Sequence, residues 1–115
     1  MPVVTHQGYE VMLDRARREG FAWPAINVLE IATVNAAIEG FAAAGSDGII
    51  QISVAAGAHT SGRIKDPVLG AITLAEPRRR VAERYPVQIA IHTDQCPTEK
   101  GDSFLRPLIA ETARR

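Results

Sequence analysis

The spacing of apolar side chains along the chain predicts an alternation of helices and short strands. Residues 5–19, 30–45 and 65–85 carry apolar side chains three and four positions apart, which is the period of one face of an α-helix. Gly20 and Gly45 follow the first two segments, and glycine is the residue that most often ends a helix. The pattern therefore predicts three helices, the first two with defined ends.

Pro77 interrupts the third helical segment. A proline inside a helix removes one hydrogen bond and clashes with the preceding turn, so a kink or two shorter helices are expected over residues 65–85. A final helix is predicted over residues 102–115, with Asp102 as its N-cap. Residues 55–63 are rich in glycine, serine and threonine and are predicted to form a loop.

Three apolar runs without helical spacing are predicted to be β-strands: residues 21–27, 47–54 and 86–94. The second run is continuously apolar, which is typical of a strand buried on both faces of a parallel sheet. Pro24 has no backbone N–H, so the first run cannot donate a hydrogen bond to a neighbouring strand at that position. A helix followed by alternating strands and helices predicts an α/β fold, and 115 residues form one domain at most.

Composition and charge narrow the class of protein. The 13 basic residues balance the 13 acidic ones, so no overall field favours nucleic acid or an acidic membrane surface. The cluster Arg78–Arg80 has acidic neighbours and is interpreted as a solvated helix face. The single cysteine, Cys96, excludes an internal disulfide and fits a reducing cytosol. We find no signal-peptide pattern and no apolar run near the ~20 residues that cross a bilayer, so a cytoplasmic protein is expected.

Polar side chains follow all three predicted strands. The strands end in Asn27, in Ser53, and in His92 with Asp94. Because the carboxyl ends of parallel strands meet at one edge of a sheet, these side chains predict a shared ligand site. His92 and Asp94 are two residues apart and share one face of their strand. They form either a satisfied core hydrogen bond or an acid–base pair, and the sequence leaves both open.

Other candidate groups carry weaker signals. Residues 57–64 approach the phosphate-binding pattern of a nucleotide P-loop, but Arg63 replaces its lysine and Ile64 removes its hydroxyl, so a P-loop is not predicted. The three histidines do not have a metal-ligand spacing such as HxxxH. Cys96 stands beside a proline with no cationic neighbour and is interpreted as a small apolar group rather than a nucleophile.

At this point the sequence resembles the class II, metal-dependent fructose-bisphosphate aldolases, most closely their actinobacterial form. The resemblance is carried, in order and over almost the whole chain, by FAWPAIN, TVNAAIEGFAAAGSDGIIQIS, KDPVLGAITLAE, RYPVQIAIHTDQCP and DSFLRPLIA. That family is a (β/α)8 TIM barrel whose base is closed by a short helix before the first strand. The resemblance implies that residues 1–115 are the N-terminal third of such a barrel, a helix followed by about three β/α units with parallel strands.

The family cleaves fructose 1,6-bisphosphate into dihydroxyacetone phosphate and glyceraldehyde 3-phosphate, in glycolysis and gluconeogenesis, and uses zinc as a Lewis acid. The resemblance implies that Asp94 is the catalytic aspartate and that Ser53 and Asn27 bind substrate. It also implies that His92 is structural. Gln95 stands where the family has its first zinc histidine, and a neutral amide is a weak ligand for zinc, so tight zinc binding is not expected.

Three functional hypotheses remain open. The first is a truncated or interrupted aldolase, inactive as 115 residues alone. The second is a non-catalytic relic or interaction module that pairs its open strand edge with a partner, or with itself. The third is a relative that acts on another ketose bisphosphate, such as tagatose 1,6-bisphosphate. A sugar phosphate is the expected ligand, the full-length family is homo-oligomeric, and no nucleic acid or membrane partner is expected.

Overall fold

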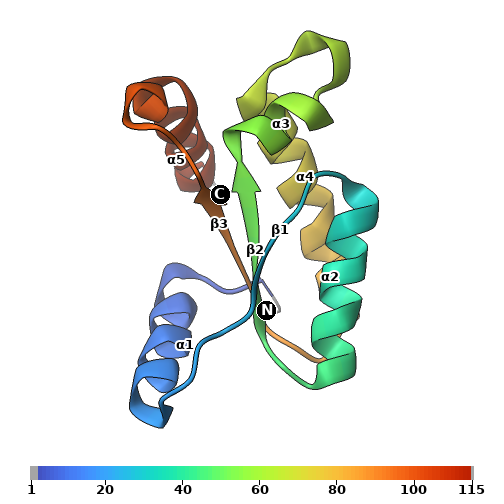
Figure 1. Cartoon of the computed structure of the whole chain (residues 1–115), viewed down its shortest axis with the longest axis vertical. Helices are drawn as coiled ribbons and strands as arrows, with labels where there is room; N and C mark the ends of the chain where they lie inside the picture. The colour runs from blue at the N-terminus through green and yellow to red at the C-terminus, as the bar shows by residue number, and fades with distance from the viewer. Residues whose placement is uncertain (1–2, 115) are drawn as a thin grey trace.

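The computed structural model describes residues 3–114, which fold around a sheet of three parallel strands (Figure 1). The strands are β1 (Ala25–Asn27), β2 (Gly48–Ser53) and β3 (Ile89–Asp94), hydrogen-bonded in the order β1-β2-β3. The helices are α1 (His6–Glu19), α2 (Ile31–Ala44), α3 (Val54–Thr60), α4 (Pro67–Ala82) and α5 (Arg106–Ala113). The predicted α/β fold, with a helix before three parallel β/α units, is confirmed.

Local chemistry sets the ends of the helices. The hydroxyl of Thr5 accepts a hydrogen bond from the amide of Gly8 at 3.1 Å and caps the start of α1. Gly20 and Gly45 end α1 and α2 in the left-handed conformation, with φ of 72° and 65°. Asp66 caps α4 by accepting from Leu69 at 3.1 Å. The two predicted glycine stops are therefore confirmed.

Two predictions about the segments outside the strands are wrong, and of the kink or two shorter helices expected at Pro77, the two helices are wrong. Residues 55–63 are not a loop, because they form most of α3 and the start of a short 3-10 helix, Gly62–Ile64. Pro77 does not divide its segment, because α4 is a single 16-residue helix through it. Asp102 is not an N-cap. It lies in a π-helical turn, Gly101–Leu105, that follows a 3-10 turn, Thr98–Lys100, and its carboxylate pairs with Arg106 at the start of α5.

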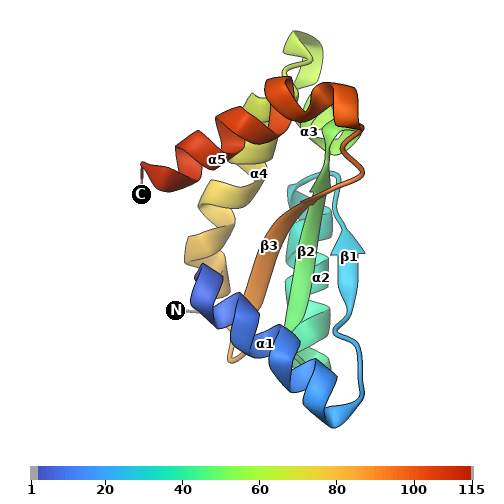
Figure 2. The ribbon, with the colours of Figure 1, turned by 90° about the vertical axis from the view of Figure 1, so that its left-hand side faces the viewer.

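The two faces of the sheet are covered differently. Helices α2 and α4 lie together on one side of the sheet (Figure 1), where Ile50, Ile52 and Ile89 pack into the main core. Helix α1 crosses the opposite face near the amino ends of the strands (Figure 2), where Met12 packs on Ile49 and Ala90. Helix α1 therefore does not cover the part of that second face near the carboxyl ends of the strands, where the polar residues lie.

The strand register places these polar residues in rows. Asn27 pairs with Gln51, and Gln51 pairs with His92, so the three lie side by side on the face that α1 covers only in part. Ser53 and Asp94 pair one row higher on that face. Within residues 3–114, no helix is both long and apolar enough to span a membrane.

Helices α3 and α4 touch through backbone rather than side chains. A Cβ atom added at Gly70 would lie 1.7 Å from the carbonyl oxygen of Gly57. A Cβ atom added at Gly57 would lie 2.2 Å from the carbonyl oxygen of Pro67. Both distances are far below van der Waals contact, so only glycine fits at this crossing.

We predict that Gly70→Ala lowers the free energy of unfolding by about 1–3 kcal/mol, because the new methyl group has to push two backbones apart. The matched control is Gly40→Ala in α2, where an added Cβ meets nothing within 4 Å. That control should raise stability by about 0.5–1 kcal/mol, since alanine loses less backbone entropy in a helix. Urea unfolding of both variants is the measurement, and equal effects would contradict the close crossing.

Candidate functional site

The candidate site is a hydrogen-bonded chain of three side chains, one from each strand. The side-chain amide of Gln51 donates to Asn27 Oδ1 at 2.9 Å, and Asn27 Nδ2 donates to Asp94 Oδ2 at 2.9 Å. Asn27 and Asp94 come from the two outer strands, so their side chains lean over β2 to meet. The structure thus brings together two predicted site residues that are 67 positions apart in the sequence.

Gln51 sets the orientation of Asn27. Because Gln51 donates to the carbonyl oxygen of the Asn27 side chain, the amide nitrogen of Asn27 has to face Asp94. The sequence reasoning missed Gln51, although a signal was present. It is the polar residue inside the apolar run of β2, two positions before Ser53, and the period of a strand places both on one face.

Asp94 is half-buried at the end of β3 and held by this network. One of its oxygens, Oδ2, accepts from Asn27, while no hydrogen bond to Oδ1 is found from residues 3–114. A carboxylate fixed through one oxygen can exchange a proton with a ligand hydroxyl through the other. The arrangement therefore suits general acid–base chemistry.

Ser53 has a structural contact at the same edge. Its hydroxyl oxygen accepts from the amide of Ala56 at 3.0 Å and caps α3. The hydroxyl hydrogen is not used in that bond, so Ser53 can still donate to a ligand. In the register of the sheet, Ser53 lies beside Asp94.

His92 and Asp94 do not form the pair that the sequence suggested. Nδ1 of His92 lies 2.9 Å from the carbonyl oxygen of Thr93, and its ring stands 6.2 Å from that of Tyr9. Asp94 bonds to Asn27 instead. The core hydrogen bond and the acid–base pair are thus both wrong, because Asn27, reaching across β2 from the other outer strand, donates to Asp94 instead.

Gln95 follows β3 with an exposed side chain and a left-handed backbone, at φ 51°. A neutral amide beside one carboxylate is a poor set of donors for zinc, which prefers imidazole, thiolate or carboxylate. Residues 3–114 contain no group of three or more His, Cys, Asp or Glu side chains placed to hold a metal ion. The residues present therefore do not fit a zinc ion, and no chemical step is assigned to one.

Cys96 lies next to this site but turns away from it. Its half-buried side chain packs against the main core, and its sulfur contacts the carbonyl oxygen of Pro97 at 3.6 Å. This placement agrees with the interpretation of Cys96 as a small apolar group.

Comparison with known proteins shows which family the chain is similar to. The family model of class II fructose-bisphosphate aldolase matches residues 7–109. The fructose-bisphosphate aldolase of Mycobacterium leprae is 51% identical over 116 residues, which cover 100% of this chain and 34% of the relative. That of Streptomyces coelicolor is 50% identical with the same coverage.

A solved structure gives the same result for the fold. The crystal structure of fructose-bisphosphate aldolase from Campylobacter jejuni superimposes with a TM-score of 0.90 at 31% sequence identity. The match covers 97% of this chain and 33% of the solved chain, so this chain spans about a third of the relatives that it matches. On the match to residues 7–109 and these relatives, the chain belongs to the class II fructose-bisphosphate aldolase family.

Proposed function

We propose that this chain supplies the proton-transfer part of an aldolase centre that cleaves fructose 1,6-bisphosphate. The observation that carries the proposal is the Gln51–Asn27–Asp94 network, which holds a carboxylate at the carboxyl ends of three parallel strands. Family membership supplies the reaction class. The cytoplasm, where sugar phosphates are found, is the proposed compartment.

Asp94 acts on the substrate hydroxyl at the bond that breaks. When its carboxylate takes the proton from that hydroxyl, the oxygen becomes a carbonyl and the neighbouring carbon–carbon bond breaks. The bonding electrons move onto the ketose half, towards its carbonyl. Asn27 holds Asp94 in position through the 2.9 Å hydrogen bond, and Ser53 binds the aldehyde half of the substrate through its free hydroxyl hydrogen.

The ketose carbonyl needs an electrophile to accept those electrons, and the described residues do not provide one. Because the chain spans about a third of its relatives, we assign that group to the remaining two-thirds of a barrel. Residues 1–115 would then be one part of an incomplete domain, and the assembled protein a homo-oligomer. Tagatose 1,6-bisphosphate is an alternative substrate, since no described contact distinguishes the two sugars.

Gln95 favours a second candidate function. The amide replaces the family's zinc histidine, so a non-catalytic relic that keeps the fold without the metal also explains the sequence. Activity measured in a complete barrel distinguishes the two functions.

We predict that the 115 residues alone neither retain stoichiometric zinc nor cleave fructose 1,6-bisphosphate. Joined to the remaining two-thirds of the Mycobacterium leprae relative, the chain should gain zinc affinity and turnover when Gln95→His is introduced, because imidazole is a far stronger ligand than an amide. Metal content and a coupled cleavage assay are the measurements. Gln88→His, an exposed position outside the strands, is the control. No gain from Gln95→His would contradict the assigned position.

In the same chimaera carrying Gln95→His, Asp94→Asn should lower kcat by about 10²–10⁴-fold, because the amide cannot exchange the substrate proton. KM should change little, since the substitution keeps the shape of the side chain. Asp102→Asn, which removes an exposed carboxylate paired with Arg106, is the matched control and should leave kcat unchanged. A small effect of Asp94→Asn would assign proton transfer to another group.

In the same chimaera carrying Gln95→His, Gln51→Leu tests the positioning of Asn27. Loss of its hydrogen bond frees the Asn27 amide to turn, which should lower kcat by about three- to tenfold at nearly constant KM. The control, Gln88→Leu, removes an exposed amide whose side chain makes no hydrogen bond recorded within residues 3–114. If both variants keep full activity, Gln51 has no role in orienting the site.

A further inference from the structure

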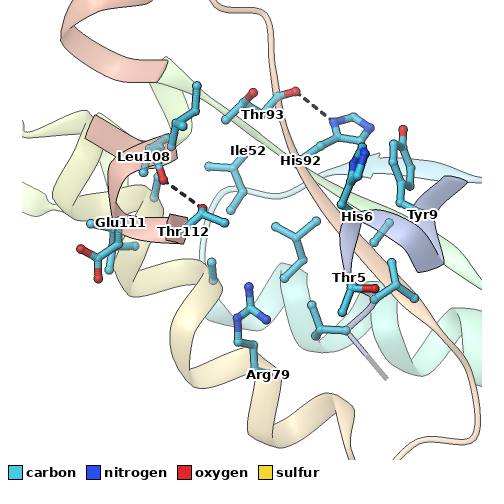
Figure 3. Close-up of a pocket in the computed structure, with 18 of the residues that line it drawn as sticks. Thr5, His6, Tyr9, Ile52, Arg79, His92, Thr93, Leu108, Glu111 and Thr112 are labelled. Atoms are coloured by element: carbon cyan, nitrogen blue, oxygen red, sulfur yellow. Dashed lines mark hydrogen bonds between the residues drawn. The ribbon is translucent and has the colours of Figure 1, made fainter. Parts of the chain in front are cut away.

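The place of Asn27 depends on the turn that connects β1 to α2, because Asn27 is the last residue of its strand. Of the residues that the structure describes, none from the Gln51–Asn27–Asp94 network lines the groove of about 630 Å³ beside β3 (Figure 3). Strand β1 is the opposite outer strand of the sheet, so the contacts that hold its last residue lie away from that groove.

Backbone groups of this turn are tied to β2, to α2 and to α3. The amide of Val28 donates to the Gln51 carbonyl oxygen at 3.0 Å, which extends the pairing with β2 by one residue. The amide of Leu29 donates to the hydroxyl oxygen of Thr33 at 3.0 Å, in the first turn of α2. These two bonds attach the turn to its own sheet and to the helix that follows. The carbonyl of Leu29 makes the bond to α3.

Thr60 supplies the donor for that carbonyl. Its Oγ1 donates to the Leu29 carbonyl oxygen at 2.7 Å, although the two residues are 31 positions apart. Thr60 is the last residue of α3, and Ser53 is the N-cap of the same helix. Helix α3 lies at the carboxyl end of β2, beside the turn that leads from β1 into α2 (Figure 1). It therefore links Ser53 at its start with the turn after Asn27 at its end.

A further contact between the same two segments is weaker. Nε2 of His59 lies 3.9 Å from Oε2 of Glu30, and both side chains are more than half exposed, at 55% and 60%. Exposed ion pairs contribute little, because water screens the charges and ordering two long side chains costs entropy. The half-buried hydroxyl of Thr60 makes a short, direct hydrogen bond. The link between α3 and the turn thus depends mainly on Thr60.

We propose that Thr60 is a positioning residue for proton transfer: its hydrogen bond to the Leu29 carbonyl holds the turn after β1, and the turn holds Asn27 where its amide reaches Asp94. This inference rests on the proposed function and adds to it a residue from outside the strands. Asn27 and Asp94 come from strands about 9–10 Å apart, which is two strand spacings. Both side chains have to extend fully across β2, so a small movement of the turn lengthens their 2.9 Å hydrogen bond.

Thr60→Val, made in the chimaera that carries Gln95→His, removes the hydroxyl and keeps the shape of the side chain. It should lower kcat by about three- to tenfold at nearly constant KM. Thr60→Ser keeps the hydroxyl and should stay within about twofold of the parent. Thr73→Val is the matched control, because the Thr73 hydroxyl donates to the Gly70 carbonyl at 2.9 Å inside α4. This control should leave kcat unchanged.

A double-mutant cycle distinguishes positioning from a general loss of stability. When Asn27→Ala is already present, Thr60→Val should change kcat by less than about twofold, because no Asn27 amide remains to be positioned. An equal loss of kcat with and without Asn27→Ala would overturn the proposal. Circular dichroism checks that each variant folds.

The side-chain amide of Asn27 gives a readout that needs no catalysis. In NMR spectra of the 115-residue chain, Asp94→Ala gives the resonance of this amide without its acceptor. Thr60→Val should shift the Asn27 amide resonance towards that value, whereas Thr60→Ser and Thr73→Val should not. An unmoved resonance in Thr60→Val overturns the proposal, and so does full kcat of Thr60→Val where Asp94→Asn is impaired.

Failure of the proposed function has a different signature. In that case Asp94→Asn keeps full activity in the chimaera, while Thr60→Val still shifts the Asn27 amide resonance. That result supports the link from Thr60 to Asn27 and assigns proton transfer to another group.

Discussion

The register of β2 against its two neighbours is the constraint on which the fold and the site both depend. Side chains alternate strictly between the faces of a strand, so a slip of one residue would exchange the core of the sheet with its polar face. In the observed register, Ile50 and Ile52 point into the core under α2 and α4, while Gln51 and Ser53 point to the other side. The apolar core thus constrains the site as well, because a slip of one residue would turn those isoleucines out of the core.

Much of the fold could be predicted from the sequence because its signals are local. The three strands and the glycines that end α1 and α2 follow from periodicity and from the φ freedom of glycine. Helix α3 could not be predicted, because its composition suggests a loop and its close backbone contact with Gly70 in another helix is not visible in the local sequence. The continuity of α4 through Pro77 also depends on contacts distant in the sequence, since Leu74 and Ala82, on either side of the proline, are buried in the core.

The sequence predicts where the candidate site lies in the fold, but not which of its side chains hydrogen-bond to one another. Strand ends in a parallel sheet meet by topology, so the grouping of Asn27, Ser53 and Asp94 follows once the strands are identified. Which donor reaches Asp94 depends on geometry across strands. Sequence spacing favoured His92, whereas the folded sheet brings Asn27 within 2.9 Å. The role of Gln51 depends on a contact across strands: its place on the face of Ser53 can be read from the sequence, but its hydrogen bond to Asn27 cannot.

The left-handed backbone at Gln95 bears on which side chains suit this position. Histidine is enriched several-fold in that conformation, as are asparagine and aspartate, whereas glutamine has no such preference. The main chain at the end of β3 therefore has a shape that histidine, asparagine or aspartate adopts more readily than glutamine. Glutamine and histidine codons differ only in their third base, so a single nucleotide change would introduce a residue that adopts this conformation more readily.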